Sequence, residues 1–255
     1  MGKKEVLLLW TGGWDSTFRL LQLAEMEIVV KPIYIIDPLR SSREFEINAM
    51  RKILDAIKSD KRFRADLNDI KFYEADWILQ NCKDEQISRD YLYMHKKYKL
   101  GTQYEWIALL CKYESLRMES AILCHSHSKV GDAIKAEGAI VPLEDDFIGG
   151  RMKVVPRDGN KVAYNVLGNL ILPLVDITKQ DEERMAREKG WIDIMKLTWF
   201  CHSPINGKPC GLCNPCDDAI SLGMKWRMPN EALKRHKYRK LNAFVCKCSG
   251  ILKRH

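Results

Sequence analysis

The sequence contains no long apolar run, and this absence limits where the protein can work. None of its apolar stretches approaches the roughly 20 residues that a transmembrane helix needs. The short apolar run near the N-terminus is smaller than the core of a signal peptide. Low-complexity tracts and internal repeats are also absent, so neither a disordered chain nor a repeat array is expected. We therefore expect a cytoplasmic protein without membrane association, whose nine cysteines are reduced thiols or metal ligands rather than disulfides.

The size and charge of the chain set further limits. With 255 residues and 46% apolar residues, one large domain, or one domain with a small appendage, is expected. A net charge of +8 is compatible with a polyanionic partner such as ATP or tRNA, and equally with a solvated surface. Basic residues concentrate near the end of the chain, at Lys234–Lys237 and at Arg239 and Lys240, so nucleic-acid contact through that segment stays open.

The stretch WTGGWDSTF (residues 10–18) follows an apolar run of strand length and precedes leucines at helical spacing. This order of strand, glycine turn and helix suits a phosphate, because Gly12 and Gly13 let a ligand approach the main chain and the helix N-terminus presents free N–H groups. Three polar residues follow that could cap the helix, bind a metal or contact phosphate oxygens: Asp15, Ser16 and Thr17. The Walker pattern G-x-x-x-x-G-K-[ST] and the dinucleotide pattern G-x-G-x-x-G are both absent. A glycine turn with a capped helix and no ligand is the alternative interpretation.

Apolar runs alternate with amphipathic segments along the chain, which predicts an α/β fold with a parallel sheet covered by helices on both faces. The expected strands are residues 6–10, 29–36, 70–75, 121–124 and 170–174. The expected helices are residues 41–57, opened by a capping box of Ser41 and Glu44, 106–116, and 178–190, opened by a capping box of Thr178 and Asp181. Residues 77–100 lack clear periodicity, and residues 131–168 are predicted to be rich in loops. Ligands bind beyond the carboxyl ends of such strands, where the glycine loop, Asp37 and His125 would meet.

Four cysteines near the C-terminus form the pattern C-x8-C-x2-C-x2-C: Cys201, Cys210, Cys213 and Cys216. Four closely spaced thiols suit tetrahedral Zn²⁺. An iron–sulfur cluster and reduced, unliganded cysteines are the alternatives. Because a closed four-thiolate site is structural, the metal should stabilise this segment rather than take part in chemistry. We therefore divide the chain into an α/β domain (residues 1–197) and a helical metal-binding segment (residues 198–255).

The glycine loop and the cysteine pattern together resemble those of the 7-cyano-7-deazaguanine synthase family of PP-loop ATP pyrophosphatases. That family carries S-G-G-x-D-S after the first strand, and here Thr11 replaces the first serine while the other positions match. The similarity continues through residues 170–220, including Lys179 and the segment T-W-x-C that leads into the cysteines. The resemblance implies a Rossmann-like (HUP-type) fold, ATP, Mg²⁺ and Zn²⁺ as cofactors, and a homodimer.

The resemblance also implies a reaction and a set of residues. Such a ligase adenylates a carboxylate, lets ammonia or an amine attack, and can convert the amide into the nitrile used for queuosine. The implied ATP-binding residues are Trp10, Thr11, Gly12, Gly13, Asp15, Ser16, Thr17, Ile36, Asp37 and Lys179. Asp15, Ser16 and Lys179 would be catalytic, and the four cysteines would hold zinc.

Two segments depart from the family pattern, and both concern the acceptor. Residues 100–105 replace the family's P-G-R-N stretch, and residues 124–132 replace its Y-P-D-C-R segment. ATP activation therefore carries over from the resemblance, but the substrate does not. The expected acceptor is 7-carboxy-7-deazaguanine or a related acid, and tRNA or a protein is an open alternative. His125 and His127 are expected to line the substrate pocket, one as the base for the incoming amine, or to be loop histidines bonded to backbone. A PP-loop tRNA-modifying enzyme and a non-catalytic nucleotide-binding module with a zinc ribbon are the alternative functions.

Overall fold

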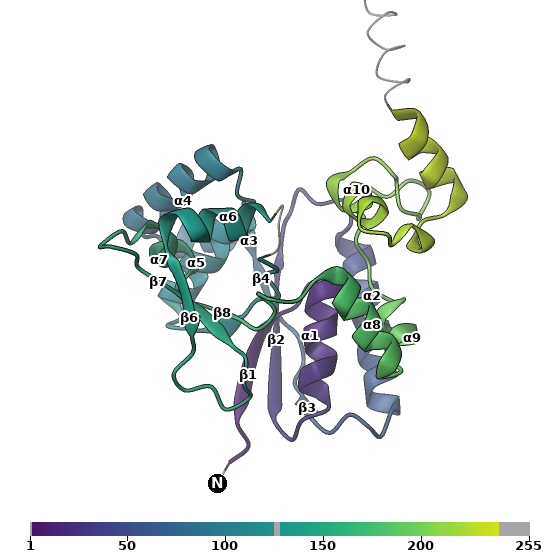
Figure 1. Ribbon diagram of the computed structural model, residues 1–255, viewed down its shortest axis with the longest axis horizontal. Helices are drawn as coiled ribbons and strands as arrows, with labels where there is room; N and C mark the ends of the chain where they lie inside the picture. The colour runs from purple at the N-terminus through teal and green to yellow at the C-terminus, as the bar shows by residue number, and fades with distance from the viewer. Residues whose placement is uncertain (1, 125–127, 240–255) are drawn as a thin grey trace, which may run out of the picture.

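A computed structural model describes residues 2–124 and 128–239 (Figure 1). The strands are β1 (Glu5–Leu9), β2 (Val29–Ile36), β3 (Asp66–Leu67), β4 (Lys71–Glu74), β5 (Met118–Glu119), β6 (Ala139–Pro142), β7 (Met152–Val155) and β8 (Leu170–Leu172). The helices are α1 (Trp14–Ala24), α2 (Arg43–Ser59), α3 (Ala75–Asn81), α4 (Glu85–Tyr98), α5 (Gln103–Tyr113), α6 (Lys129–Glu137), α7 (Val162–Leu167), α8 (Lys179–Glu188), α9 (Ile192–Met195), α10 (Asn214–Ser221) and the 3₁₀ turn η1 (Lys225–Arg227). Residues 230–239 are also helical.

The strands form one sheet in the order β3-β2-β1-β5-β8-β7-β6, and β4 extends the edge by pairing with β2. Pairs among β1, β2, β3, β4, β5 and β8 are parallel, as the sequence predicts. The pairs β6–β7 and β7–β8 are antiparallel, so the prediction of an entirely parallel sheet is wrong at that edge. Residues 143–151 join β6 to β7 without a helix, because an antiparallel pair needs no crossover connection.

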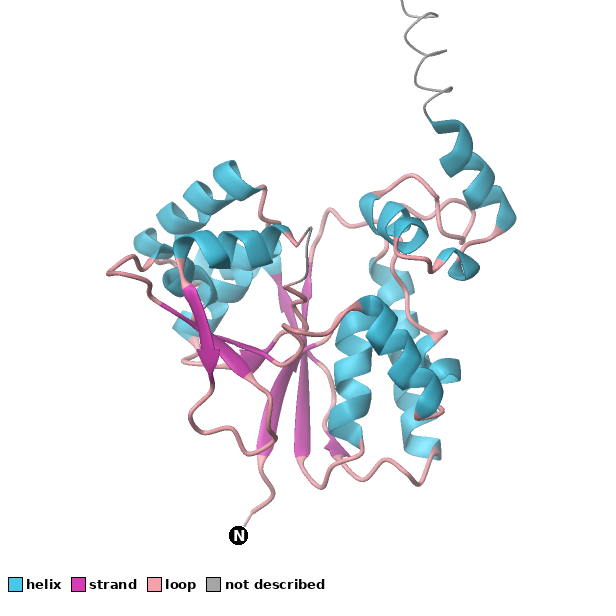
Figure 2. Ribbon diagram, viewed as in Figure 1, coloured by secondary structure: helices cyan, strands magenta, loops and turns pink. Residues whose placement is uncertain are grey.

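Helices cover both faces of this sheet, which confirms the predicted layers (Figure 2). On one face lie α1, α2, α8 and α9, and on the other lie α3 to α7. Each face has its own apolar cluster: the first is built around Phe18, Met50 and Trp191, and the second around Met94 and Leu110. A third, smaller cluster lies in the C-terminal segment around the cysteines. None of the described helices is long and apolar enough to span a bilayer.

Two of the sequence predictions for the middle of the chain are wrong. Residues 131–168, predicted to be rich in loops, contain most of α6 and all of β6, β7 and α7, whereas residues 77–100, for which no element was predicted, are largely helical, in α3 and α4. The strand expected at residues 121–124 lies earlier, as β5, and residues 121–124 are irregular although largely buried. In α4 the buried residues Ile87, Asp90, Tyr91 and Met94 do recur at helical spacing, but one of them is an aspartate, so the apolar pattern in the sequence is incomplete.

The two predicted capping boxes have different outcomes. Thr178 and Asp181 form one at the start of α8, where Asp181 N–H donates to Thr178 Oγ1 at 3.1 Å and Thr178 N–H donates to Asp181 Oδ2 at 3.2 Å. The box predicted for Ser41 is wrong, because α2 begins at Arg43 with Ser42 as its N-cap. Ser41 instead donates from Oγ to the carbonyl of His202 at 3.0 Å, which ties the start of α2 to the cysteine segment.

A buried ion network that the sequence did not predict joins α1, β5 and the β6–β7 loop. Glu119 accepts from Arg19 Nε at 2.6 Å and from Arg151 Nη1 at 3.3 Å, and all three side chains are buried. Arg151 Nε also donates to Asp146 Oδ1 at 2.6 Å. Charges in an apolar interior must be paired, so this network holds α1 in one position against the sheet.

Candidate functional site

The glycine loop connects β1 to α1 at the carboxyl edge of the sheet. Gly12 has φ +66°, and a Cβ there would lie 2.9 Å from Met50 Cγ and 3.1 Å from the carbonyl oxygen of Glu46. Only glycine fits this left-handed, closely packed position without strain. The N-cap of α1 is Gly13, which provides no side-chain cap, so the N–H groups of the first turn are left for a ligand. The loop therefore has the geometry of an anion-binding helix N-terminus.

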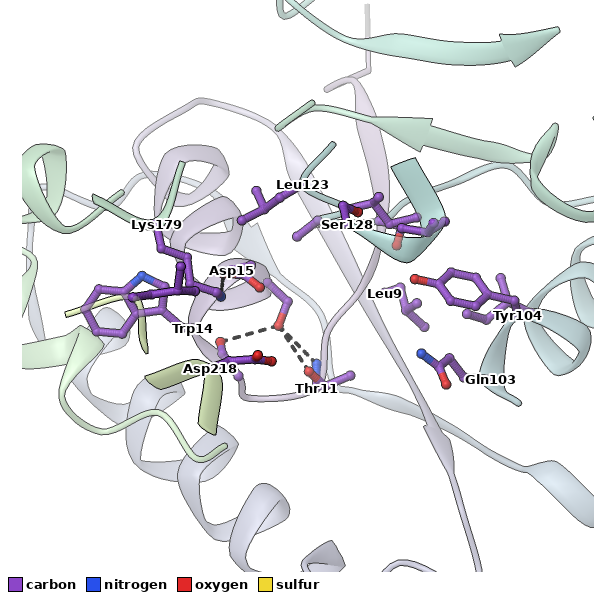
Figure 3. Close-up of a pocket in the computed structure, with 18 of the residues that line it drawn as sticks. Leu9, Thr11, Trp14, Asp15, Gln103, Tyr104, Leu123, Ser128, Lys179 and Asp218 are labelled. Carbon is purple, nitrogen blue, oxygen red and sulfur yellow. Dashed lines mark hydrogen bonds and ion pairs between the residues drawn. The ribbon is translucent and has the colours of Figure 1, made fainter. Parts of the chain in front are cut away.

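A cavity of about 620 Å³ opens over this loop, between α1 and α8 on one side and α5 and α6 on the other (Figure 3). Polar groups gather at the loop end, where Asp15, Lys179 and Asp218 approach one another. The far end carries Tyr104 and Gln103 from α5. The apolar wall consists of Leu9, Ile107, Ile122, Leu123 and Val130. A cavity of this size with an apolar wall and a few convergent polar groups is typical of a small-molecule site.

Lys179 and Asp15 form an ion pair at the loop, although 164 positions separate them in the sequence. Lys179 is the first residue of α8, and the confirmed capping box fixes the direction in which it leaves that helix. Both side chains are partly buried, at 19% and 30% exposure, so the pair lies at the cavity wall rather than in bulk solvent. A cation and a carboxylate at a helix N-terminus provide partners for a phosphate and for its counter-ion.

Beneath this pair lies Glu182, which is completely buried and has no hydrogen-bond partner for either carboxylate oxygen within the described chain. Burial, together with the negative charge of Asp15, raises the pKa of Glu182 well above its usual range, while Lys179 opposes the shift. Trp14 Nε1, a buried donor, also lacks a hydrogen-bond partner within the described chain, and it lies near the Glu182 carboxyl group. The surroundings of Glu182 therefore favour its neutral form.

The structure brings together only some of the residues that the sequence predicts for this site. Thr11, Gly13, Asp15, Ser16 and Lys179 line the cavity. The other predicted residues lie elsewhere or outside the description. Trp10 and Thr17 are buried and bonded to each other, with Trp10 Nε1 donating to Thr17 Oγ1 at 3.0 Å. Gly12, Ile36 and Asp37 are not among the cavity-lining residues, and His125 and His127 lie outside the described residues.

Two residues of the site were missed by sequence reasoning. Asp218 lies on α10, just after the last cysteine, and burial raises the pKa of its carboxyl group, with Lys179 opposing this. Tyr104 is on α5, and burial raises the pKa of its hydroxyl group beyond the usual range. No short motif marks either residue, because only packing of α5 and α10 against the loop brings them to the cavity.

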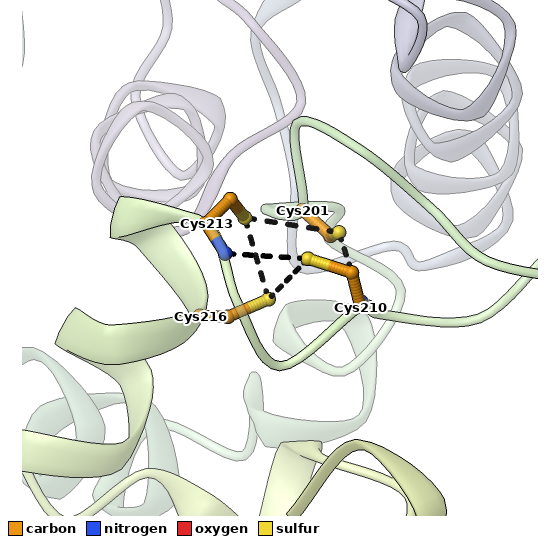
Figure 4. A group of neighbouring side chains, drawn as sticks. All are labelled: Cys201, Cys210, Cys213 and Cys216. Atoms are coloured by element: carbon orange, nitrogen blue, oxygen red, sulfur yellow. Dashed lines mark hydrogen bonds between the residues drawn. The ribbon is translucent and has the colours of Figure 1, made fainter. Parts of the chain in front are cut away.

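The four cysteines lie together in the C-terminal segment, as predicted (Figure 4). The Sγ atoms of Cys210 and Cys216 are 3.8 Å apart, those of Cys201 and Cys213 are 3.9 Å apart, and those of Cys213 and Cys216 are 3.5 Å apart. Four sulfurs bound to one ion at about 2.3 Å in a tetrahedron would be about 3.8 Å apart. The group can therefore hold a tetrahedral metal ion such as Zn²⁺.

Backbone N–H groups also point at these sulfurs. Cys210 N–H donates to Cys201 Sγ at 3.1 Å, and Leu212 and Cys213 each donate from N–H to Cys210 Sγ at 3.3 Å. Burial opposes ionisation of Cys210, but the N–H groups of Leu212 and Cys213 outweigh it and lower its pKa to about 7. Such N–H···S contacts support thiolates, the form that binds a metal.

The basic residues near the C-terminus are partly engaged with the cysteine loop. Arg235 donates from Nε to the carbonyl of Cys210 at 2.7 Å, and Arg239 donates from Nη1 to Asp217 at 2.7 Å. These two guanidinium groups therefore help to hold the segment together, while Lys240 lies outside the described residues.

Comparisons with known proteins add no assignment. No protein-family model matches the chain, and no curated protein matches it.

Proposed function

We propose that this protein binds ATP at the glycine loop and uses it to activate a carboxylate for attack by ammonia or an amine. The observation that carries the proposal is the convergence on one cavity of the uncapped start of α1 and the distant Lys179. The apolar wall suits the nucleoside, and the loop N–H groups suit the phosphates. The sequence resemblance to the PP-loop family supports the same assignment.

The proposed chemistry needs charge stabilisation rather than a nucleophilic side chain. A carboxylate oxygen of the acceptor attacks the α-phosphorus of ATP, and the bond to the departing pyrophosphate breaks. Ammonia then attacks the carbonyl carbon of the acyl-adenylate, AMP leaves, and a proton passes to solvent or a base. The loop N–H groups and Lys179 would stabilise negative charge on the phosphates. Repetition with a second ATP would activate the amide oxygen and give a nitrile.

Two metals belong to the proposal. Mg²⁺ bound with ATP fits the carboxylates of Asp15 and Asp218, because hard cations prefer oxygen ligands, and it would neutralise phosphate charge. With Asp15 engaged in this way, Lys179 is free to contact phosphate. Zn²⁺ fits the four-cysteine group, where a closed thiolate set makes it structural.

The test follows AMP and the acceptor together by mass spectrometry, with ATP, Mg²⁺, ammonium and 7-carboxy-7-deazaguanine as the first acceptor. We expect AMP with amide or nitrile, and a rate that falls about 10²- to 10³-fold in Lys179→Met, the typical cost of removing one stabilising donor. Lys189→Met is the matched control, because Lys189 follows the far end of α8 and pairs with Glu25 at the surface.

Other outcomes separate the alternatives. AMP formed only with tRNA or a protein as acceptor would keep ATP activation and replace the small acid as substrate. Bound ATP that never yields AMP with any acceptor would indicate a non-catalytic nucleotide-binding module. No measurable ATP binding would refute the proposal.

A further inference from the structure

A second cavity, of about 440 Å³, adjoins the larger one between the turn from α4 to α5 and the start of α10. Tyr104, Val130 and Asp218 belong to the linings of both cavities, so the two are adjacent. In Figure 3, Asp218 lies at the loop end of the larger cavity and Tyr104 at the opposite end. The remaining lining residues of the second cavity are Lys99, Leu100, Gly101, Lys129, Asn214 and Asp217. A ligand in the second cavity would therefore contact the same carboxylate that lies beside the glycine loop.

Two lysines from separate elements provide the positive charge of this second cavity. Lys99 is the C-cap of α4 and has φ 58°, a left-handed conformation that glycine or asparagine adopts more readily. Lys129 is the first residue of α6, where the helix dipole disfavours a positive charge. Both lysines are exposed, and no ion pair joins either of them to a carboxylate of residues 2–124 and 128–239. Their ammonium groups are therefore available to a ligand.

The start of α10 provides acidic groups on the other side of the second cavity. Asp217 and Asp218 line it together with Asn214, which lies one turn earlier. Asp217 Oδ1 accepts from Arg239 Nη1 at 2.7 Å, so this carboxylate already has a partner. Asp218 has no ion pair with any residue that the structure describes, and it belongs to both cavities. The lysines line the second cavity alone, so its positive groups and its shared acid lie in different parts of the lining.

We propose that the second cavity binds the nitrogen donor of the reaction, and that this donor is a free amino acid whose carboxylate contacts Lys99 and Lys129 and whose ammonium group contacts Asp218. The inference rests on the proposed function, because it identifies the nucleophile of that reaction. A ligand with a single charge would match only one part of this lining, whereas an amino acid carries both charges. Ammonia would not need a cavity of about 440 Å³.

This donor changes the product of the proposed reaction. The ammonium group gives one proton to the Asp218 carboxylate or to water, its nitrogen bonds to the carbonyl carbon of the acyl-adenylate, and the bond from that carbon to the oxygen of AMP breaks. The nitrogen then loses its second proton to solvent, which leaves a secondary amide. Because that nitrogen carries a carbon substituent, the amide cannot be dehydrated to a nitrile. Asp218 has two carboxylate oxygens, so one can serve Mg²⁺ and the other the amine.

The test supplies the protein with ATP, Mg²⁺, 7-carboxy-7-deazaguanine, ammonium and an equimolar mixture of the common amino acids, and identifies the products by mass. We expect AMP and an amide that carries one amino acid. For the amino acid that reacts best, KM should be about tenfold lower than for its carboxamide, which lacks the negative charge. If unsubstituted amide or nitrile is the only product, the inference is overturned and the proposed function stands.

A double variant tests the lysines directly. Lys99→Gln with Lys129→Gln should raise KM for the preferred amino acid about tenfold, to the value for its carboxamide, and should leave KM for the carboxamide unchanged. Lys96→Gln is the matched control, because it removes an exposed charge from the last turn of α4 outside the cavity. Equal KM values for the amino acid in the double variant and in the control would overturn the inference. A peptide N-terminus that reacts as well as the free amino acid would also overturn it, because that amine lacks an adjacent carboxylate.

Binding is measured separately, by NMR saturation transfer from the protein to the amino acids of the mixture, with and without ATP and Mg²⁺. We expect transfer to the preferred amino acid in the wild type and much less in the double variant. Binding that depends on the two lysines in a protein that never forms AMP would keep the amino-acid site and refute the proposed function instead. No transfer to any amino acid in the wild type would overturn the inference.

Discussion

Replacing Cys216 with serine should release the metal and open the C-terminal segment while the α/β part stays folded. Cys216 is completely buried, and its Sγ lies within 3.5 to 3.8 Å of those of Cys213 and Cys210. Among residues 2–124 and 128–239, only the other three cysteines share this ligand group. Within residues 198–239, the buried residues of this cluster besides cysteines are Met228 and Ala232, with Trp199, Phe200, Ile220 and Leu233 packed partly buried against them. Such a small core cannot stabilise the segment by itself.

The size of the effect follows from the metal. Structural zinc contributes about 10–16 kcal/mol to the folding of zinc-finger peptides. Even about 4 kcal/mol of local stabilisation slows opening about a thousandfold, since every 1.4 kcal/mol is a factor of ten. The amides of Cys210, Leu212 and Cys213, which donate to sulfur, report this opening directly.

The assay combines metal analysis with hydrogen exchange followed by mass spectrometry. The wild-type protein should carry one zinc ion and protect these amides, whereas Cys216→Ser should lose the ion and exchange them about a thousandfold faster. Peptides from β1 and α1 should keep their protection. Cys82→Ser, the same change at a buried cysteine in the other core, should keep the zinc. Wild-type zinc content in Cys216→Ser, or unchanged exchange in residues 198–239, would refute the reasoning.

Three further changes test other parts of the structure. Glu119→Gln removes the carboxylate paired with the buried Arg19 and leaves Arg151 with Asp146 alone, so it should lower the unfolding free energy in urea by about 3–5 kcal/mol; a loss below about 1 kcal/mol would contradict the network. Gly12→Ala should weaken ATP binding and cost more stability than Gly159→Ala, because both positions have positive φ but only Gly12 lacks space for a Cβ; equal costs would contradict this. The pKa of Glu182 is raised in the folded protein. Between about pH 4.3, where a carboxyl group of the unfolded chain titrates, and that raised pKa, the folded state binds one proton more than the unfolded state, so the unfolding free energy falls as pH rises. Glu182→Gln should flatten this fall and be more stable than the wild type at neutral pH; an unchanged pH profile of the urea midpoint would contradict it.

Local sequence signals were sufficient to predict the elements whose structure depends on neighbouring residues alone. The β1–loop–α1 unit, β2 and the capping box of α8 form as predicted, because strand runs, glycine turns and caps depend on neighbouring residues. The cysteine group was predictable for the same reason, since two short C-x-x-C steps bring three thiols close together in any fold. The middle of the chain was predicted poorly, because its buried faces include charged residues such as Asp90 of α4 and Glu137 of α6, which interrupt the apolar pattern.

The composition of the site depended on packing. Nothing near Asp15 in the sequence indicates that Glu182 lies buried beneath it, or that Arg227 is held between Trp14 and Phe200. By itself, the sequence determined that a glycine turn leads from the first strand into the start of a helix, and that four thiols can meet around a metal. Only the tertiary structure decided which cations and acids surround the start of α1, because they come from segments about 25 to 200 residues away. Burial of apolar surface brings these segments together, and the hydrophobic effect is non-directional, so no local sequence pattern marks which segments will meet.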